Sequence, residues 1–275
     1  MAECVRSIGE KFDGFYEFFR VLQGQKNLRE LGKCENVLDM VRFFYRLSVK
    51  KTKVKYGMTA KGLYQSDVYA LLTILEKLGQ ELIPQYNLVF VDEGQDISAS
   101  EYALLKKINK SAAFNVYGDL KQNITTWRGV KDWRETGVEG EIYTLNQNYR
   151  NTNQIVSFVT ERVDADMEAI GFDGKPVISI GQREAVSFFK DKKGTRAVIA
   201  LPEELPALKR SAYNVVSETG VLSKKKVNLM SVYESKGLEF SCVAVYDKGM
   251  SENEKYIAYT RALGELAIVT DGKKK

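Results

Sequence analysis

The chain has 275 residues, and its 41 Lys+Arg against 36 Asp+Glu give a formal net charge of +5. With 44% hydrophobic and 28% charged residues, it has the composition of a folded protein of one large or two small domains. The absence of histidine excludes Ser-His-Asp triads, Cys-His dyads and Cys/His zinc sites. Because no apolar run reaches the roughly 18 residues of a membrane helix and the N-terminus lacks a signal-peptide core, we expect a cytoplasmic protein with no membrane partner.

The N-terminal region, residues 1–85, is expected to be helical. Apolar residues recur at helical spacing over 37–45, and a second helix is predicted from Ser66, with an apolar stripe over 68–78. Pro84 closes the region. Residues 1–85 are either the remnant of an accessory subdomain or an unrelated cap over the sheet that follows.

From Tyr86 onward, predicted strands alternate with predicted helices. The strands cover 88–91, 113–117, 142–144, 186–189, 197–200, 227–232, 242–246 and 266–269, and the helices cover 100–110, 152–170 and 252–263. Gly171 is placed to end the helix over 152–170. This alternation predicts an α/β protein with parallel sheets.

Two acids follow the first of these strands. Leu88–Val91 is a continuous apolar run typical of a buried parallel strand, and Asp92 and Glu93 come directly after it. Ligands of α/β sheets gather at the carboxyl ends of strands. One carboxylate at that edge can bind hydrated Mg²⁺ while its neighbour deprotonates a water. The structural alternative is an acid pair that favours the N-terminus of a following helix.

Five segments, in order along the chain, resemble the motifs of superfamily 1 helicases of the UvrD/Rep type. Residues 91–96 resemble "DEAQD", 118–129 resemble "GDxxQxIYxWRGA", 145–152 resemble "LxxNYRS", 231–240 resemble "TxHxxKGLEF" and 256–262 resemble "YVAxTRA". The short spacing around 171–176 resembles that of HelD-like members. The resemblance extends over about residues 66–270.

The resemblance implies a P-loop NTPase-type fold with RecA-like parallel sheets. Residues 86–145 are then a partial first RecA-like domain carrying the Walker B acids, and 146–275 are a nearly complete second one. It also implies an ATP-dependent helicase or translocase, with ATP and Mg²⁺ bound between the two lobes. Hydrolysis would drive movement along single-stranded DNA, in the 3′ to 5′ direction; RNA stays open as the substrate.

The same resemblance implies catalytic roles for four residues and a metal-binding role for a fifth. Glu93 would activate the attacking water, and Asp92 would bind Mg²⁺ through water. Gln122 would contact the γ-phosphate and that water. Arg150 and Arg261 would stabilise charge on the transferred phosphoryl group. A salt bridge is the structural alternative for each arginine.

Binding roles follow from the same motifs. Tyr149 would stack on adenine, and Gly237 and Glu239 would bind the nucleotide, with Glu239 accepting the ribose hydroxyls. Trp127 would stack on a base of single-stranded DNA beside Arg128. A buried core position is the alternative for Trp127.

The chain departs from the family pattern at the phosphate-binding loop. The Gly-Lys pairs at 32–33, 174–175 and 272–273 are followed by Cys, Pro and Lys, and never by Ser or Thr, so no Walker A loop is recognised. Thr125 and Tyr233 stand where the family has an aromatic residue and a histidine.

Because no Walker A loop is recognised, we expect the isolated chain to be inactive, with the loop supplied by a second chain or by a missing N-terminal segment. An unconventional phosphate site in the basic N-terminal region is the least favoured reading. The alternative function is a degenerate, non-hydrolytic ATPase fold that binds nucleic acid or RNA polymerase.

Overall fold

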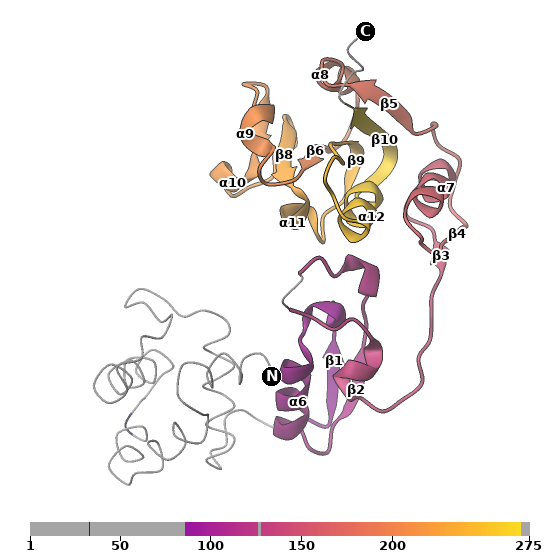
Figure 1. Cartoon of the computed structure of the whole chain (residues 1–275), viewed down its shortest axis with the longest axis vertical. Helices are drawn as coiled ribbons and strands as arrows, with labels where there is room; N and C mark the ends of the chain where they lie inside the picture. The colour runs from indigo at the N-terminus through magenta and orange to yellow at the C-terminus, as the bar shows by residue number, and fades with distance from the viewer. Residues whose placement is uncertain (1–32, 34–85, 126–127, 271–275) are drawn as a thin grey trace. The chain divides into compact units, whose positions relative to one another are not determined.

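The computed structural model describes residue 33 and residues 86–125 and 128–270 (Figure 1). The helices predicted within 1–85 lie outside these residues. The described chain falls into two compact units. The first contains residues 86–120 and the described part of 125–139, and the second contains 121–124 and 140–270.

The first unit is built on a short parallel sheet. Strands β1 (Leu88–Val91) and β2 (Ala113–Val116) pair in parallel and are joined by helix α6 (Ala99–Ile108). Helix α6 begins at Ser98, whose side chain forms a capping box with Glu101. The 3₁₀ turn η1 (Gly94–Asp96) follows β1. A second 3₁₀ turn, η3 (Trp133–Thr136), comes shortly before residue 140, where the second unit resumes. The predicted strands over 88–91 and 113–117 and the predicted helix over 100–110 are confirmed.

The two faces of this sheet differ in burial. Val91 packs with Tyr102 and Val130 in a small core, whereas Leu88 and Phe90 are exposed. The apolar run had predicted a strand buried on both faces. Only one face is buried because α6 covers one side of the sheet.

The second unit contains a six-stranded, all-parallel sheet with the order β5-β10-β9-β6-β8-β7 (Figure 1). Its strands are β5 (Ile178–Gly181), β6 (Arg196–Ala200), β7 (Tyr213–Val215), β8 (Val227–Ser231), β9 (Phe240–Val245) and β10 (Ala262–Thr270). The predicted strands over 197–200, 227–232, 242–246 and 266–269 are confirmed. The predicted α/β class with parallel sheets is confirmed as well.

Helices cover both faces of the six-stranded sheet. Alternate strand residues point to opposite sides, so Ile199 packs with α7 (Asn153–Arg162) and α12 (Glu252–Thr260). Val198 packs on the other side with α8 (Ala185–Phe188) and α9 (Leu205–Leu208). Two short helices, α10 (Val216–Thr219) and α11 (Val232–Ser235), follow β7 and β8.

Three predicted elements were wrong. Residues 142–144 form no strand, and the side chains of Ile142 and Tyr143 are exposed. The helix predicted over 152–170 ends at Arg162, because the chain extends so that β4 (Glu168–Ala169) can pair with β3 (Gln147–Asn148). The apolar run over 186–189 is not a strand but contributes to α8, whose first turn closes when the Phe188 amide donates to the Glu184 carbonyl.

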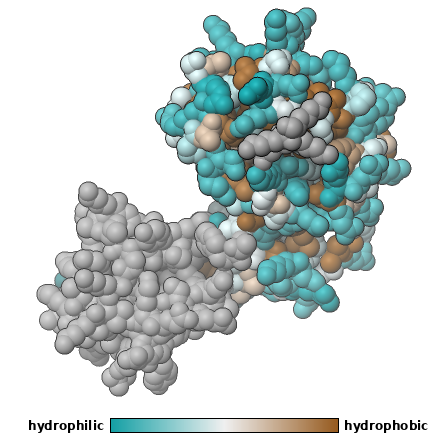
Figure 2. All heavy atoms as spheres, turned by 45° about the horizontal axis from the view of Figure 1, so that its top comes forward, coloured by the Kyte–Doolittle hydropathy of each residue, from teal (hydrophilic) through white to brown (hydrophobic). Residues whose placement is uncertain are grey.

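Exposed hydrophobic side chains occur in both units, for example Phe90 in the first and Tyr149 in the second. On the face shown in Figure 2, hydrophobic side chains are scattered among hydrophilic ones. Within residues 86–125 and 128–270, no helix combines the length and the apolar character needed to cross a lipid bilayer.

Candidate functional site

The predicted Walker B acids lie at the carboxyl end of β1. Asp92 and Glu93 are both exposed, and the Glu93 amide donates to Asp92 Oδ1 at 2.9 Å. Glu93 has a φ of 50°, in the left-handed region that non-glycine residues seldom adopt. The backbone turns sharply at this residue, so both carboxylates remain open to solvent.

A buried glutamine fixes the Glu93 side chain. Gln95 is fully buried, and its Nε2 donates to Glu93 Oε2 at 2.6 Å. Its Oε1 accepts from the Asp119 amide at 3.0 Å, at the end of β2. The carboxyl ends of β1 and β2 are thus joined through one amide side chain. Sequence reasoning treated Gln95 only as part of the motif, because burial and partners are set by tertiary contacts.

The turn below Glu93 is held by Tyr102 from α6. Its hydroxyl donates to the Gly94 carbonyl at 2.9 Å, and the Gly94 amide donates to the Tyr117 carbonyl at 2.7 Å. Burial, assisted by the charge of Glu101, raises the pKa of Tyr102 to about 12. The hydroxyl therefore keeps its proton, and remains a donor, at neutral pH.

Gln122 lies in a segment that belongs to the second unit. It ends the 3₁₀ turn η2 (Leu120–Gln122), and its carbonyl accepts from Lys236 Nζ at 2.7 Å. Asn253 Nδ2 donates to the neighbouring Asn123 carbonyl at 2.8 Å, and Ile124 packs against the core of that unit. No local pattern indicates these tethers, since Lys236 and Asn253 follow Gln122 by more than 100 residues.

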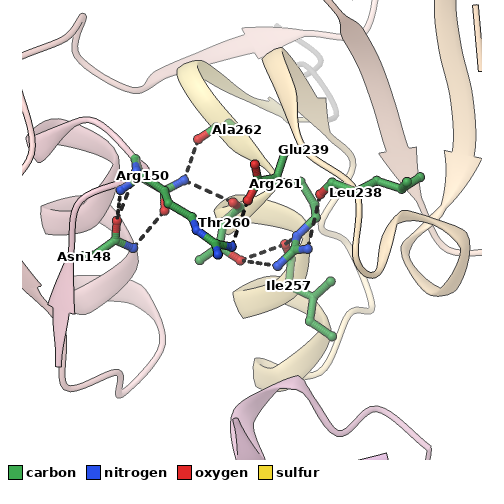
Figure 3. A network of polar contacts seen from close by, with 9 residues as sticks. Asn148, Arg150, Leu238, Glu239, Ile257, Thr260, Arg261 and Ala262 are labelled. Carbon is green, nitrogen blue, oxygen red and sulfur yellow. Dashed lines mark hydrogen bonds and ion pairs between the residues drawn. The ribbon is translucent and has the colours of Figure 1, made fainter. Parts of the chain in front are cut away.

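The two predicted phosphate-binding arginines lie in contrasting surroundings (Figure 3). Arg150 is exposed, and its Nη1 forms an ion pair with Glu239 Oε1 at 3.0 Å. Arg261 is buried at the end of α12 and donates from Nη1 to the Leu238 carbonyl at 3.2 Å. It also donates from Nε to the Ile257 carbonyl at 3.2 Å. In the structure, Arg150 and Glu239, predicted to bind different parts of ATP, bind each other.

Two asparagines connect the segments that carry these arginines. Asn148 Oδ1 accepts from the amides of Arg150 and Asn151, both at 3.0 Å. Asn151 Nδ2 donates to the Thr260 and Ala262 carbonyls at 3.0 and 2.6 Å. Arg261 lies between those two carbonyls in sequence. Neither asparagine was predicted as a functional residue, although both stand inside a recognised motif.

The other predicted binding residues of the second unit are accessible. Tyr149 is 66% exposed, which leaves its ring available for stacking. Gly237 has a φ of 75°, so the backbone conformation requires glycine although a Cβ would meet no atom within 4 Å.

The predicted DNA-binding pair is only partly described. Trp127 lies outside the described residues. Arg128 donates from Nη2 to Glu101 Oε1 at 3.0 Å, in an ion pair whose carboxylate is almost fully buried. This contact ties the motif segment to α6.

Asp92 and Glu93 could contribute to a metal site in which most of the ligands are water or substrate phosphates. Among residues 86–125 and 128–270, no group of three or more His, Cys, Asp or Glu side chains forms a metal cage. Mg²⁺ commonly keeps several waters and takes one or two carboxylates together with substrate phosphates. An exposed, single Asp92 carboxylate suits that mode of binding.

Comparison with known proteins finds one family to which part of the chain is similar. The family described as the UvrD/REP helicase N-terminal domain matches residues 21–132, a range that includes β1, α6, β2 and the acid pair. Over these residues the chain is similar to the UvrD-like helicases of superfamily 1.

Individual UvrD-like relatives are distant. One component of an ATP-dependent helicase/nuclease from Streptococcus mutans is 26% identical over 59% of this chain and 15% of its own length. "ATP-dependent DNA helicase Rep" of Escherichia coli is 30% identical over 33% of this chain and 15% of its own length. A solved C-terminal domain of a possible DNA helicase from Lactobacillus plantarum is 22% identical, covers 46% of this chain and 88% of that one, and has a TM-score of 0.37. The chain therefore spans about a seventh of the curated relatives it matches.

The UvrD-like pattern has a histidine where this chain has Tyr233. The Tyr233 hydroxyl donates to Glu254 Oε1 at 2.6 Å, and that hydrogen bond raises the pKa of Tyr233 to about 12. Glu254 also accepts from the Ser251 amide, at the start of α12. Tyr233 therefore joins α11 to α12 as a neutral donor, whereas a histidine would titrate near neutral pH.

Proposed function

We propose that this chain forms part of an ATP-dependent DNA helicase or translocase motor of the UvrD-like type. Hydrolysis of Mg²⁺-ATP would drive movement along single-stranded DNA in the 3′ to 5′ direction. The observation that carries this proposal is the fixed carboxylate at the end of β1. The fully buried Gln95 donates a hydrogen bond that holds the Glu93 side chain in place, and the Glu93 carboxylate stays open to solvent.

The acids have separate tasks in this proposal. Bound Mg²⁺ would neutralise charge on the β- and γ-phosphates. Asp92 would bind its water shell, and Glu93 would orient and deprotonate the attacking water. Because Gln95 donates to one oxygen of Glu93, the carboxylate cannot rotate freely, and its other oxygen can face the water.

The second unit would supply positive charge and nucleotide contacts for the same reaction. Arg150 and Arg261 would stabilise the phosphoryl group, while Gln122 contacts the attacking water. Tyr149 would stack on the base, and Glu239 would accept the ribose hydroxyls. The exposed ion pair between Arg150 and Glu239 must open for both groups to reach ATP, which costs little because exposed pairs contribute under about 1 kcal/mol.

The comparisons support a domain assignment and two kinds of ligand. The family match begins at residue 21, so we assign residues 21–85 to the helicase N-terminal domain in preference to an unrelated cap. The names of the relatives support ATP and DNA as ligands. We further propose that the phosphate-binding loop comes from another segment or chain, so that residues 1–275 alone do not turn over ATP.

The test combines binding and turnover by the full chain. We expect binding of oligo(dT) and of Mg²⁺-ATP, with hydrolysis no faster than that of the Glu93→Gln variant. Binding of oligo(dT) without any nucleotide binding would favour the non-hydrolytic module instead. Binding of neither ligand would refute the proposal. DNA-stimulated hydrolysis that Glu93→Gln abolishes would support the motor and refute the external source of the loop.

A further inference from the structure

We propose that Asn151 is a positioning residue that locks Arg150 and Arg261 into one rigid arrangement, so that both arginines reach the terminal phosphate of the same nucleotide. This inference rests on the proposed function for the roles of the two arginines. The connection itself rests only on contacts within the second unit, shown in Figure 3.

The first contact set lies on the Arg261 side. Asn151 is 3% exposed, and its Nδ2 donates to the carbonyls of Thr260 and Ala262. These carbonyls flank Arg261, at the junction of α12 and β10. A carboxamide nitrogen has two hydrogens, and both are used here. The backbone on either side of Arg261 is therefore held by one planar group.

The second contact set lies on the Arg150 side. Asn148 Nδ2 donates to Asn151 Oδ1 at 2.8 Å, and Asn148 Oδ1 accepts from the Arg150 and Asn151 amides. The loop around Arg150 is thus closed on itself and joined to Asn151. Because these polar groups are satisfied together and Asn151 is buried, breaking one contact leaves the others strained or unpaired.

Few other side chains can make both sets of contacts. Aspartate has the shape of asparagine but no hydrogens to donate, and it would face two carbonyl oxygens. Serine, which the helicase pattern has at this position, is shorter and has a single donor, so it cannot span two carbonyls. The bridge in this chain therefore depends on the carboxamide of Asn151.

The link has a specific consequence for nucleotide choice. Arg150 and Arg261 are both assigned to the terminal phosphate, so a loss of their alignment should weaken ATP binding and leave ADP binding almost unchanged. A defect in folding alone would weaken both nucleotides together. The ratio of the two dissociation constants therefore separates positioning from general stability.

The first measurement does not need nucleotide. Hydrogen exchange of the full chain is compared for wild type, Asn151→Asp and Asn151→Ser, with Asn146→Ala as the control. Asn146 lies in the same segment, but its side chain pairs with Asp166, away from both arginines. We expect both Asn151 variants to speed exchange of residues 147–152 and 259–263 together, and the control to leave 259–263 unchanged. Unchanged exchange of 259–263 in both Asn151 variants would overturn the inference.

The second measurement is binding of Mg²⁺-ATP and Mg²⁺-ADP to the same four proteins. We expect the Asn151 variants to bind ATP about tenfold more weakly, which is about 1.4 kcal/mol, with ADP changed less than twofold. Asn151→Ser serves if Asn151→Asp does not fold. Equal loss of both nucleotides would overturn the positioning role. Wild-type protein that binds neither nucleotide would refute the proposed function and, with it, the phosphate role, while the exchange data would still decide whether Asn151 joins the two segments.

Discussion

Gly118 lies against the glutamine that holds Glu93, and Gly118→Ala should disturb that contact. A Cβ at this position would lie 2.2 Å from Gln95 Oε1, 2.9 Å from the Trp133 ring carbon Cη2 and 3.0 Å from the Gly94 amide nitrogen. Real Cβ atoms essentially never lie closer than 3.0 Å to such atoms, and the Gly94 nitrogen is backbone. Gln95 must therefore move, although it is fully buried.

The cost follows from the bonds that Gln95 makes. Moving it weakens the 2.6 Å bond to Glu93, which is charge-assisted and contributes about 1.5–3 kcal/mol, and the 3.0 Å bond from the Asp119 amide, which contributes about 0.5–1.5 kcal/mol. We expect Gly118→Ala to lower the free energy of unfolding by about 2–4 kcal/mol. Urea unfolding followed by tryptophan fluorescence measures this part of the chain, because both tryptophans, Trp127 and Trp133, lie between residues 125 and 139.

Two controls decide whether Gln95 is the cause. Gly181→Ala introduces a Cβ whose nearest neighbour is 3.6 Å away, so it should cost less than about 1 kcal/mol, as measured by circular dichroism. In a Gln95→Ala background, Gly118→Ala should lose at least about 1 kcal/mol of its effect. The close contact between Gly118 and Gln95 would be contradicted by either of two results. One is a loss of unfolding free energy for Gly118→Ala as small as that for Gly181→Ala, and the other is the same loss in the presence and absence of Gln95.

Three further predictions concern single contacts. Tyr102→Phe removes the donor to the buried Gly94 carbonyl and should cost about 1–3 kcal/mol in urea unfolding; a loss below about 0.5 kcal/mol would contradict the hydrogen bond. The pKa of Tyr102 is raised to about 12 in the folded protein, so its contribution is complete below pH 10 and is lost as pH rises through 12. The urea concentration at the unfolding midpoint should therefore decrease as pH rises from 10 to 12. In the Tyr102→Phe variant this decrease should be smaller. Glu239→Gln breaks the exposed ion pair with Arg150 and should change stability by less than about 1 kcal/mol, with little dependence on salt, so a loss above 2 kcal/mol would show a structural role.

Elements with a strong local signal could be predicted from the sequence. Continuous apolar runs such as Ala197 to Ala200 are buried on both faces of the six-stranded sheet, so their pattern directly reflects their surroundings. Helix α12 is capped by Ser251, whose capping box with Glu254 is encoded by local residues. Other runs were ambiguous. Val186 to Phe189 has the composition of a strand, but a helical turn is closed by contacts with the preceding residues.

The positions of candidate site residues were predictable, but their partners were not. The acid pair after β1 and the arginine after α12 stand at element ends, which strand and helix patterns can locate. The pairing of Arg150 with Glu239 joins residues 89 positions apart, and only the tertiary packing of the second unit brings them together. The same holds for Lys236, which holds the Gln122 carbonyl across 114 positions.

The residues that hold the candidate site in place share a chemistry that motif reading overlooks. Gln95 and Asn151 are neutral carboxamides, nearly or fully buried, and each joins two segments that are distant in sequence. A carboxamide donates and accepts at once without carrying charge, so it can be buried between backbone groups with no ionic desolvation cost. A carboxylate or an ammonium in either place would incur that cost and could not satisfy the same mixture of donors and acceptors. The charged groups assigned to chemistry can then remain at the surface or at element ends, with their orientation fixed by uncharged neighbours. Although Gln95 and Asn151 carry no charge, conservative changes at these two residues should thus disturb the orientation of the charged side chains of Glu93, Arg150 and Arg261.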